Sequence, residues 1–164
     1  DDPEMVGCIV RTIKSNTSKP VIIKVGVGST DILKIAKVAI DSGADAITAI
    51  NTIRAMTINI ETGMPVLSNK IGGLSGKSLK HIAIRCVYEI SKNLQIPVIG
   101  CGGIFTWQDA VEFMLAGASV VQLGSVIGYE GITAFKNISY GIKKYLENKG
   151  FKKVTEIVGL AHRY

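Results

Sequence analysis

Residues 96–124 read IPVIGCGGIFTWQDAVEFMLAGASVVQLG, and this stretch decides the fold class. The apolar runs at its two ends are rich in β-branched residues, which is typical of strands in a parallel sheet. Between them the spacing predicts a helix, with Thr106 and Asp109 placed as a capping box and Gly117 as its stop. A strand, a helix and a second strand in this order predict a right-handed parallel crossover.

The same alternation continues on both sides of this stretch. The further predicted elements are a helix that begins at Asp2-Pro3-Glu4, a strand over 21–26, a helix capped by Ser29 or Thr30 and closed by Gly43, a strand over 46–51, a helix over about 78–93 and a basic terminal helix. The nearly continuous apolar run at 21–26 is expected to be covered on both faces. One helix and four strand–helix units indicate an α/β fold with a parallel sheet. Because a complete (β/α)₈ barrel takes about 250 residues, we expect part of a barrel, with a small open sheet as the alternative.

Residues 52–76 interrupt the pattern with Pro65, four glycines and no helical period. Connections in α/β units usually take about 2–6 residues, so a longer one is either functional or contains small strands of its own. The alternating pieces 56–60 and 65–68 predict a hairpin within it.

The 164 residues, 47% of them apolar, are enough for one globular domain. No apolar run is long enough for a membrane span and the first residues are acidic, so we expect a cytoplasmic protein. Most of the net charge of +6 comes from lysines after residue 130, opposite the apolar positions of the terminal helix, of which Ile132 and Phe135 are the first. A solvated helix face explains these lysines better than a nucleic-acid surface, because no aromatic residues interleave with them.

Polar residues and glycines gather where the predicted strands end. They are Lys24, Asn51-Thr52, Gly102-Gly103 and Gly124-Ser125. In a barrel this edge binds the substrate, and a phosphate commonly lies between the loops after the last two strands. Glycine lets backbone amides approach an anion, and Ser125 could add a hydroxyl donor. Gly102-Gly103 alone, or Gly124-Ser125 alone, fits a simple turn, but the two together after consecutive strands favour a phosphate site.

Two of these side chains suggest ligand contacts. Lys24 interrupts an apolar strand, so it either meets an anionic ligand or reaches solvent at the rim. Asn51 can offer amide donors and a carbonyl acceptor to a planar polar ligand, or can serve as a turn residue. By contrast, His81 is expected on a helix face, and His162 has no evident partner. Trp107 and Phe105 are expected to wall the site or to pack a helix.

Five segments together resemble the dihydroorotate dehydrogenases, and most closely their class 1B catalytic subunit. They are Pro20-Val21-Ile22-Ile23-Lys24, Ile50-Asn51-Thr52-Ile53, Ile71-Gly72-Gly73-Leu74-Ser75-Gly76, Ile99-Gly100-Cys101-Gly102-Gly103-Ile104 and residues 115–124. The resemblance runs from Asp2 to about Gly159, and the Gly-Gly-Leu-Ser-Gly loop is its most specific element. It implies an eight-stranded α/β (TIM) barrel that holds FMN and oxidises dihydroorotate to orotate in pyrimidine (UMP) biosynthesis.

The resemblance also implies roles for individual residues. The positions that match FMN-binding residues are Lys24, Ile50, Gly76, Gly102, Gly103, Gly124 and Ser125, the last standing where threonine is common. Asn51 and Thr52 match the pair that contacts the pyrimidine. Lys24 would lie beside the flavin N1–O2 edge and stabilise negative charge there.

The catalytic base of class 1B enzymes is a cysteine in an Asn-Xaa-Ser-Cys-Pro-Asn type of motif, which this chain lacks. Cys8, Cys86 and Cys101 match neither that motif, nor a metal site, nor a disulfide framework, and are expected to be buried free thiols. We therefore expect residues 1–164 to form the C-terminal half of the barrel, roughly strands 5 to 8, without a catalytic residue or metal ligands and inactive alone.

The partners that the resemblance implies are the N-terminal half of the barrel, an FAD and iron–sulfur electron-transfer subunit, and further copies in a homo- or hetero-oligomer. Two alternatives stay open at this point. One is a flavoenzyme similar to dihydropyrimidine dehydrogenase, and the other is a non-catalytic half-barrel that binds phosphates or nucleotides.

Overall fold

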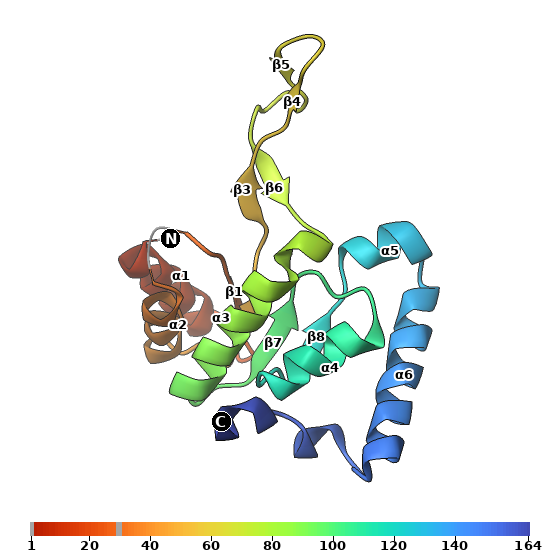
Figure 1. Ribbon diagram of the computed structural model, residues 1–164. Coiled ribbons are helices and arrows are strands. Elements are labelled where there is room, and N and C mark those ends of the chain that lie inside the picture. Colours follow the sequence, from red (N-terminus) through yellow and green to blue (C-terminus); the bar gives the residue numbers. More distant parts are fainter. Residues whose placement is uncertain (1, 29–30) are drawn as a thin grey trace.

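A four-stranded parallel sheet forms the centre of the computed structural model, which describes residues 2–28 and 31–164. The strands lie in the order β1-β2-β7-β8, and they span Ile22–Val25, Ala46–Ala49, Val98–Cys101 and Val120–Gln122. Every neighbouring pair is parallel, as the crossover pattern predicts (Figure 1). The predicted α/β class with a parallel sheet is therefore confirmed.

The helices pack against one face of this sheet. They are α1 (Pro3–Ser15), α2 (Ile32–Asp41), α3 (Lys80–Asn93), α4 (Trp107–Leu115), α5 (Ser125–Glu130) and α6 (Thr133–Lys149), with 3₁₀ turns at Lys77–Leu79, Val154–Glu156 and Leu160–Arg163. α2, α3 and α4 contact the strands directly, whereas α1 packs on α2 and α6 on α4. Ile47, Val98 and Phe113 are among the buried residues of the core between sheet and helices.

The opposite face of the sheet is only partly covered. Side chains alternate between the two faces of a strand, so Ile22 and Val120 point away from the helices, and about half of each side chain is exposed. Among the described residues, β1 and β8 each pair with a neighbour on one side only. The prediction that strand 21–26 is covered on both faces is therefore wrong for this chain, because the helices bury one face alone.

The helix ends follow the sequence closely. Asp2 caps α1 by accepting a hydrogen bond from the Glu4 N–H, and Thr106 and Asp109 form the predicted capping box of α4. The predicted caps Ser29 and Thr30 lie outside the described residues, and the N-cap of α2 is Asp31, which accepts from the Leu33 N–H. Local side-chain hydrogen bonds thus decide where these helices begin.

The terminal region contains the predicted basic helix as α6 and, before it, the short helix α5, which the sequence analysis does not predict. α5 and α6 are separate because Gly131 has a φ of 65°, which no α-helix can continue through. Ile132 and Phe135, expected on the apolar face, are 79% and 48% exposed. Cys8 is also exposed on α1, whereas Cys86 is buried and Cys101 half-buried, so the expectation of buried thiols is wrong for Cys8.

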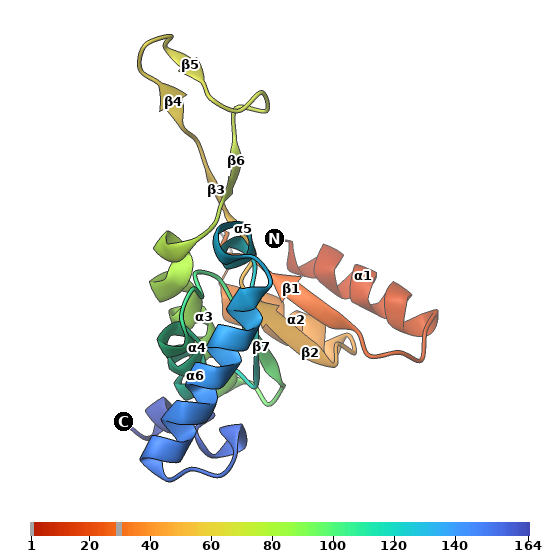
Figure 2. The same ribbon diagram turned by 90° about the vertical axis from the view of Figure 1, so that its right-hand side faces the viewer.

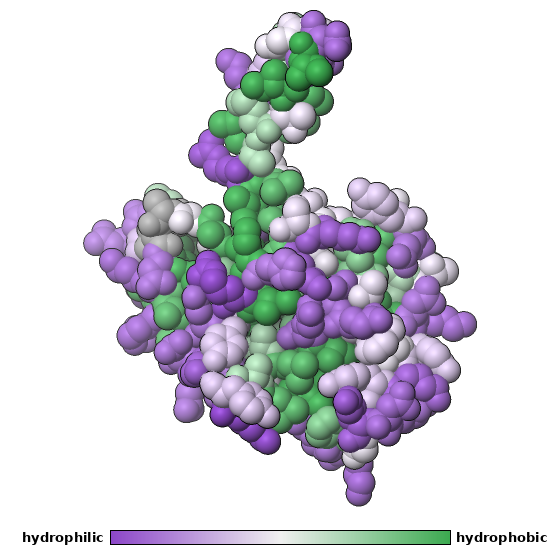
Figure 3. All heavy atoms as spheres, viewed as in Figure 1, coloured by the Kyte–Doolittle hydropathy of each residue, from purple (hydrophilic) through white to green (hydrophobic). Residues whose placement is uncertain are grey.

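Residues 53–74 form a two-stranded arm that projects away from the sheet in both views (Figures 1 and 2). β3 (Ile53–Ala55) pairs antiparallel with β6 (Gly72–Leu74), and β4 (Ile58–Asn59) with β5 (Met64–Pro65). The predicted hairpin is confirmed, and the ribbon also includes 53–55 and 72–74. Many apolar side chains of the arm are exposed, and Figure 3 shows hydrophobic surface along it.

None of the helices in residues 2–28 and 31–164 is both long enough and apolar enough to cross a membrane.

The contact of α6 with α4 depends on Gly141, which lies directly against the Trp107 ring. We expect Gly141→Ala to lower the free energy of unfolding by about 1–3 kcal/mol, because the added methyl group overlaps the indole. Gly128→Ala in α5 is the control, since a methyl group there meets nothing. Both variants gain similar helix propensity, so the difference between them in urea unfolding measures the overlap. Equal stabilities would contradict this packing.

Candidate functional site

One pocket lies where the carboxyl ends of β1, β7 and β8 meet the base of the arm. Thr52 lines it, and so do all seven residues that match cofactor-binding positions. These seven are Lys24, Ile50, Gly76, Gly102, Gly103, Gly124 and Ser125. The volume is about 140 Å³, less than the roughly 300–1,000 Å³ of a pocket that encloses a drug-sized ligand. These residues therefore form one wall of a larger site rather than a closed cavity.

Lys24 stands on the partly covered face of the sheet, at the end of β1. Its Nζ lies 3.4 Å from the Sγ of Cys101 on β7. Within the described part of the chain, no carboxylate lies within ion-pair distance of Nζ; the ion pairs involve other lysines. The Lys24 side chain is exposed and lines the pocket, so its charge is available to an anionic group there.

Backbone donors line the other side of the pocket. In the described residues, the N–H groups of Gly102, Gly103, Gly124 and Ser125 donate to no backbone carbonyl. Gly103 has a φ of 76°, and a methyl group there would collide with the backbone of Lys80, so only glycine fits. At Gly124 a methyl group would meet no protein atom. Four pocket-lining residues whose N–H groups have no backbone acceptor suit an anion such as a phosphate.

Asn51 and Thr52 connect the sheet to the arm. Asn51 Oδ1 accepts a hydrogen bond from the Thr52 N–H at 2.9 Å, which leaves the side-chain amide of Asn51 free to donate. Thr52 itself lies against Gly73 in the returning strand of the arm. Asn51 is exposed and does not line the pocket, whereas Thr52 does.

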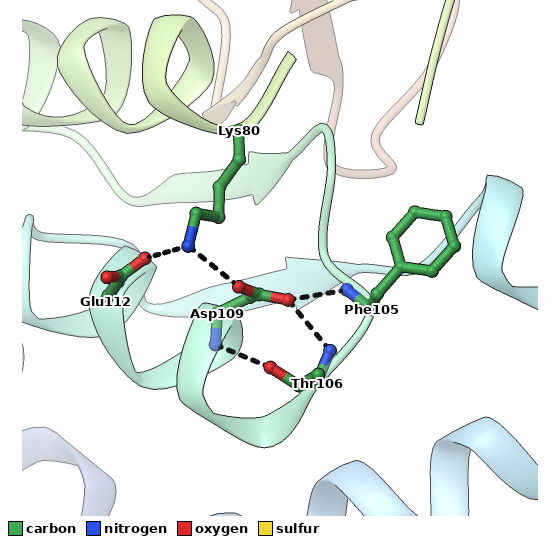
Figure 4. A network of polar contacts seen from close by, with 5 residues as sticks. All are labelled: Lys80, Phe105, Thr106, Asp109 and Glu112. Atoms are coloured by element: carbon green, nitrogen blue, oxygen red, sulfur yellow. Dashed lines mark hydrogen bonds and ion pairs between the residues drawn. The ribbon is translucent and has the colours of Figure 1, made fainter. Parts of the chain in front are cut away.

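The residues 102–105, which we call the glycine loop, are held by a network of ion pairs and hydrogen bonds (Figure 4). Asp109 Oδ2 accepts from the N–H groups of Phe105 at 3.0 Å and Thr106 at 2.9 Å. Its Oδ1 pairs with Lys80 Nζ at 2.9 Å, and Lys80 also pairs with Glu112 at 2.8 Å. The network ties the end of the glycine loop to α3 and α4.

The two central groups of this network are charged at neutral pH. Burial alone would raise the pKa of Asp109, but hydrogen bonds from Phe105, Lys80 and Thr106 outweigh it and hold that pKa below its ordinary value. The pKa of Lys80 is raised by its hydrogen bonds to Glu112 and Asp109. Both oxygens of the Asp109 carboxylate are therefore available as acceptors at neutral pH.

Other candidates from the sequence lie elsewhere. His81 is exposed on α3, as expected, whereas His162 Nε2 lies 2.9 Å from the Ala116 carbonyl and its ring meets Tyr88 edge-on. Phe105 lines the pocket, but Trp107 packs on α6. The described residues contain no cluster of His, Cys, Asp or Glu that could hold a metal ion.

Sequence reasoning missed some of the pocket residues. Ser75 lines the pocket and accepts a hydrogen bond from Ser125 Oγ at 3.1 Å, and Gln122 lines it from β8. Gln122 is the one polar residue of β8, and that signal could have identified it. The link between Lys80 and Asp109 spans two helices, so no local pattern predicts it.

Comparisons with known proteins agree on one family. The family model for dihydroorotate dehydrogenase matches residues 1–146. The chain is 50% identical over 162 residues to the protein named dihydroorotate dehydrogenase B (NAD(+)), catalytic subunit, of Pyrococcus furiosus, covering 99% of the chain and 54% of that protein. It is 50% identical over 159 residues to the protein of the same name in Thermococcus kodakarensis, covering 97% and 53%.

The Methanocella arvoryzae protein of the same name is 49% identical over 162 residues, which cover 99% of the chain and 53% of that protein. The chain spans about half the length of these curated relatives. The identity extends over nearly the whole chain, well beyond the glycine pairs that line the pocket. By its sequence, therefore, the chain belongs to the dihydroorotate dehydrogenase family.

Proposed function

We propose that this chain forms part of an FMN-dependent dihydroorotate dehydrogenase that oxidises dihydroorotate to orotate in pyrimidine biosynthesis. The observation that carries the proposal is the convergence of the seven family-matched residues on one pocket, from separate strand ends and the base of the arm. Membership of the family supports the reaction class, an oxidation at a CH–CH bond.

The chemistry of the donor set fits the phosphate of FMN. In the described residues, the N–H groups of Gly102, Gly103, Gly124 and Ser125 have no backbone acceptor, and all four residues line the pocket. Backbone amides arranged in this way bind phosphate without any cationic side chain. FMN, when bound, would supply the hydride acceptor for the oxidation.

Lys24 is the cation that this wall contributes. Its ammonium group has no carboxylate partner in the described residues and lies on the same side of the sheet as the open pocket. A fixed positive charge in a partly desolvated site stabilises negative charge that develops during the reaction. In this proposal Lys24 holds the electron-rich edge of the ring, while Ile50 packs against it.

Asn51 and Thr52 would orient the substrate. The Asn51 amide donors are free because its carbonyl oxygen is already bonded to the Thr52 N–H. A dihydropyrimidine offers carbonyl and carboxylate oxygens that such donors can hold. Fixing the substrate against the ring contributes orientation, which lowers the entropic part of the barrier.

The partly covered sheet supports the proposal that residues 1–164 supply the C-terminal half of a (β/α)₈ barrel, strands 5 to 8. The exposed side chains of Ile22 and Val120, and the single-sided pairing of β1 and β8, fit a sheet that continues into further strands. The relatives are about twice as long as the matched region. In this proposal the other half supplies the catalytic base and the remaining flavin contacts.

The names of the relatives, which specify a catalytic subunit and NAD(+), support a partner that carries electrons onward. We propose that this partner is an FAD and iron–sulfur subunit. We also propose that the assembled enzyme is a soluble oligomer in the cytoplasm.

Replacing Lys24 by methionine removes the charge and keeps most of the side-chain volume. We expect Lys24→Met to weaken flavin binding, or to slow flavin reduction, by about 10- to 100-fold, as loss of a charged interaction does. The measurements are flavin fluorescence titration and stopped-flow reduction by dihydroorotate. Lys37→Met is the control, because within residues 2–28 and 31–164 the one ion-pair partner of Lys37 is Asp41, on the surface of α2. An unchanged Lys24 variant would contradict the assignment.

Asn51→Ala should raise the KM for dihydroorotate and lower kcat, with the flavin content unchanged, because the variant loses substrate orientation rather than cofactor contacts. Steady-state kinetics and the flavin absorbance of the purified enzyme provide the test. Asn148→Ala on α6 serves as the control. A loss of flavin together with activity would place Asn51 in the cofactor site instead.

The substrate itself separates this proposal from the dihydropyrimidine dehydrogenase alternative. We expect the flavin-loaded enzyme to be reduced by dihydroorotate and not by dihydrouracil under the same conditions. Reduction by dihydrouracil alone would favour the alternative enzyme. A protein that binds free phosphate ligands but no flavin would support the non-catalytic half-barrel.

A further inference from the structure

We propose that Asp109, held by Lys80, is a positioning residue for cofactor binding: it sets the glycine loop so that the free amides of that loop face the phosphate group. This inference rests on the proposed function, because it assigns a role toward the FMN phosphate. Asp109 lies behind the loop and does not itself line the pocket.

The first step of the argument is the hydrogen bonding of Asp109. Its carboxylate accepts from the N–H groups of Phe105 and Thr106, the last residue of the glycine loop and the N-cap of α4. These two amides are thereby occupied and turned toward Asp109. The amides of Gly102 and Gly103, which have no backbone acceptor, remain for the ligand.

The second step is the double contact made by Lys80. Its backbone lies directly behind Gly103, so closely that a methyl group on Gly103 would be 2.7 Å from the backbone nitrogen of Lys80. Its side chain reaches the Asp109 carboxylate at 2.9 Å. One residue of α3 thus packs against the middle of the glycine loop and pairs with the carboxylate that holds the end of the loop. Figure 4 shows the pair with Asp109.

The third step is burial. The Asp109 and Lys80 side chains are only 14% and 20% exposed, whereas Glu112, the second partner of Lys80, is 49% exposed. Ion pairs of mostly exposed groups contribute little. The Lys80–Asp109 pair is better shielded. The Asp109 carboxylate also accepts from two backbone donors, so loss of that carboxylate removes their acceptor.

The consequence concerns the wall of the pocket. Every residue of the glycine loop lines the pocket, so a shift of the loop displaces the phosphate donors. Lys24 lies on β1 and Ile50 directly follows β2, and neither belongs to the network, so we expect both to keep their positions. Loss of Asp109 should therefore harm recognition of the phosphate more than recognition of the flavin ring.

The test compares two ligands that differ only in the phosphate, FMN and riboflavin. Both are titrated by fluorescence against the apo form of the full-length enzyme and its Asp109→Asn, Lys80→Met and Glu112→Gln variants. We expect Asp109→Asn to weaken FMN binding about tenfold or more while riboflavin affinity changes less than about twofold. Lys80→Met should shift the same ratio in the same direction, and Glu112→Gln should leave it unchanged.

The outcomes distinguish the two proposals. If the unsubstituted enzyme binds neither flavin, the proposed function fails. If it prefers FMN and the Asp109→Asn variant keeps the same preference for FMN over riboflavin, the positioning role is wrong. Equal losses for both ligands would likewise show that Asp109 merely caps α4 and stabilises the fold. Thermal unfolding of each variant, with Asp41→Asn as a surface control, shows whether Asp109→Asn remains folded; should it not, Lys80→Met decides the question by the same ratio.

Discussion

The parallel hydrogen bonding of four strands is the constraint on which the candidate site depends. Lys24 is in register with Thr48, Thr48 with Ile99, and Ile99 with Val120. Parallel strands in this register end at one edge of the sheet, so the segments that follow them meet there although they are up to about 100 residues apart in the chain. For this reason Lys24, Gly102-Gly103, Gly124-Ser125 and the base of the arm lie together.

The two faces of the sheet differ in how far their apolar side chains are buried and their charged groups are paired. On the helical side, the core is buried and the charges near the glycine loop are paired through Asp109 and Lys80. On the other side, Ile22 and Val120 are half-exposed, and Lys24 faces the open pocket without a carboxylate in the described residues. The helical face can hold the glycine loop in position, whereas the open face is where further strands or a ligand would bind.

Much of the fold was predictable from local patterns. The capping box at Thr106 and the cap at Asp2 place two helix starts correctly, because both depend on hydrogen bonds within four residues. The predictions failed where distant packing decides. The sequence predicted the basic terminal helix, which is α6, but not the short helix α5 before it. The covering of strand 21–26 depends on neighbours that its own apolar pattern cannot reveal.

The sequence by itself determined the class of fold, the family, and the residue types that reach the ends of the strands, because hydrophobic periodicity and glycine placement act over short distances. Only the tertiary structure decided that the seven family-matched residues share one pocket, and that Lys80 and Asp109, 29 residues apart, join behind the glycine loop. Such a pair forms when two helices pack side by side, and helix packing is a property of the whole core.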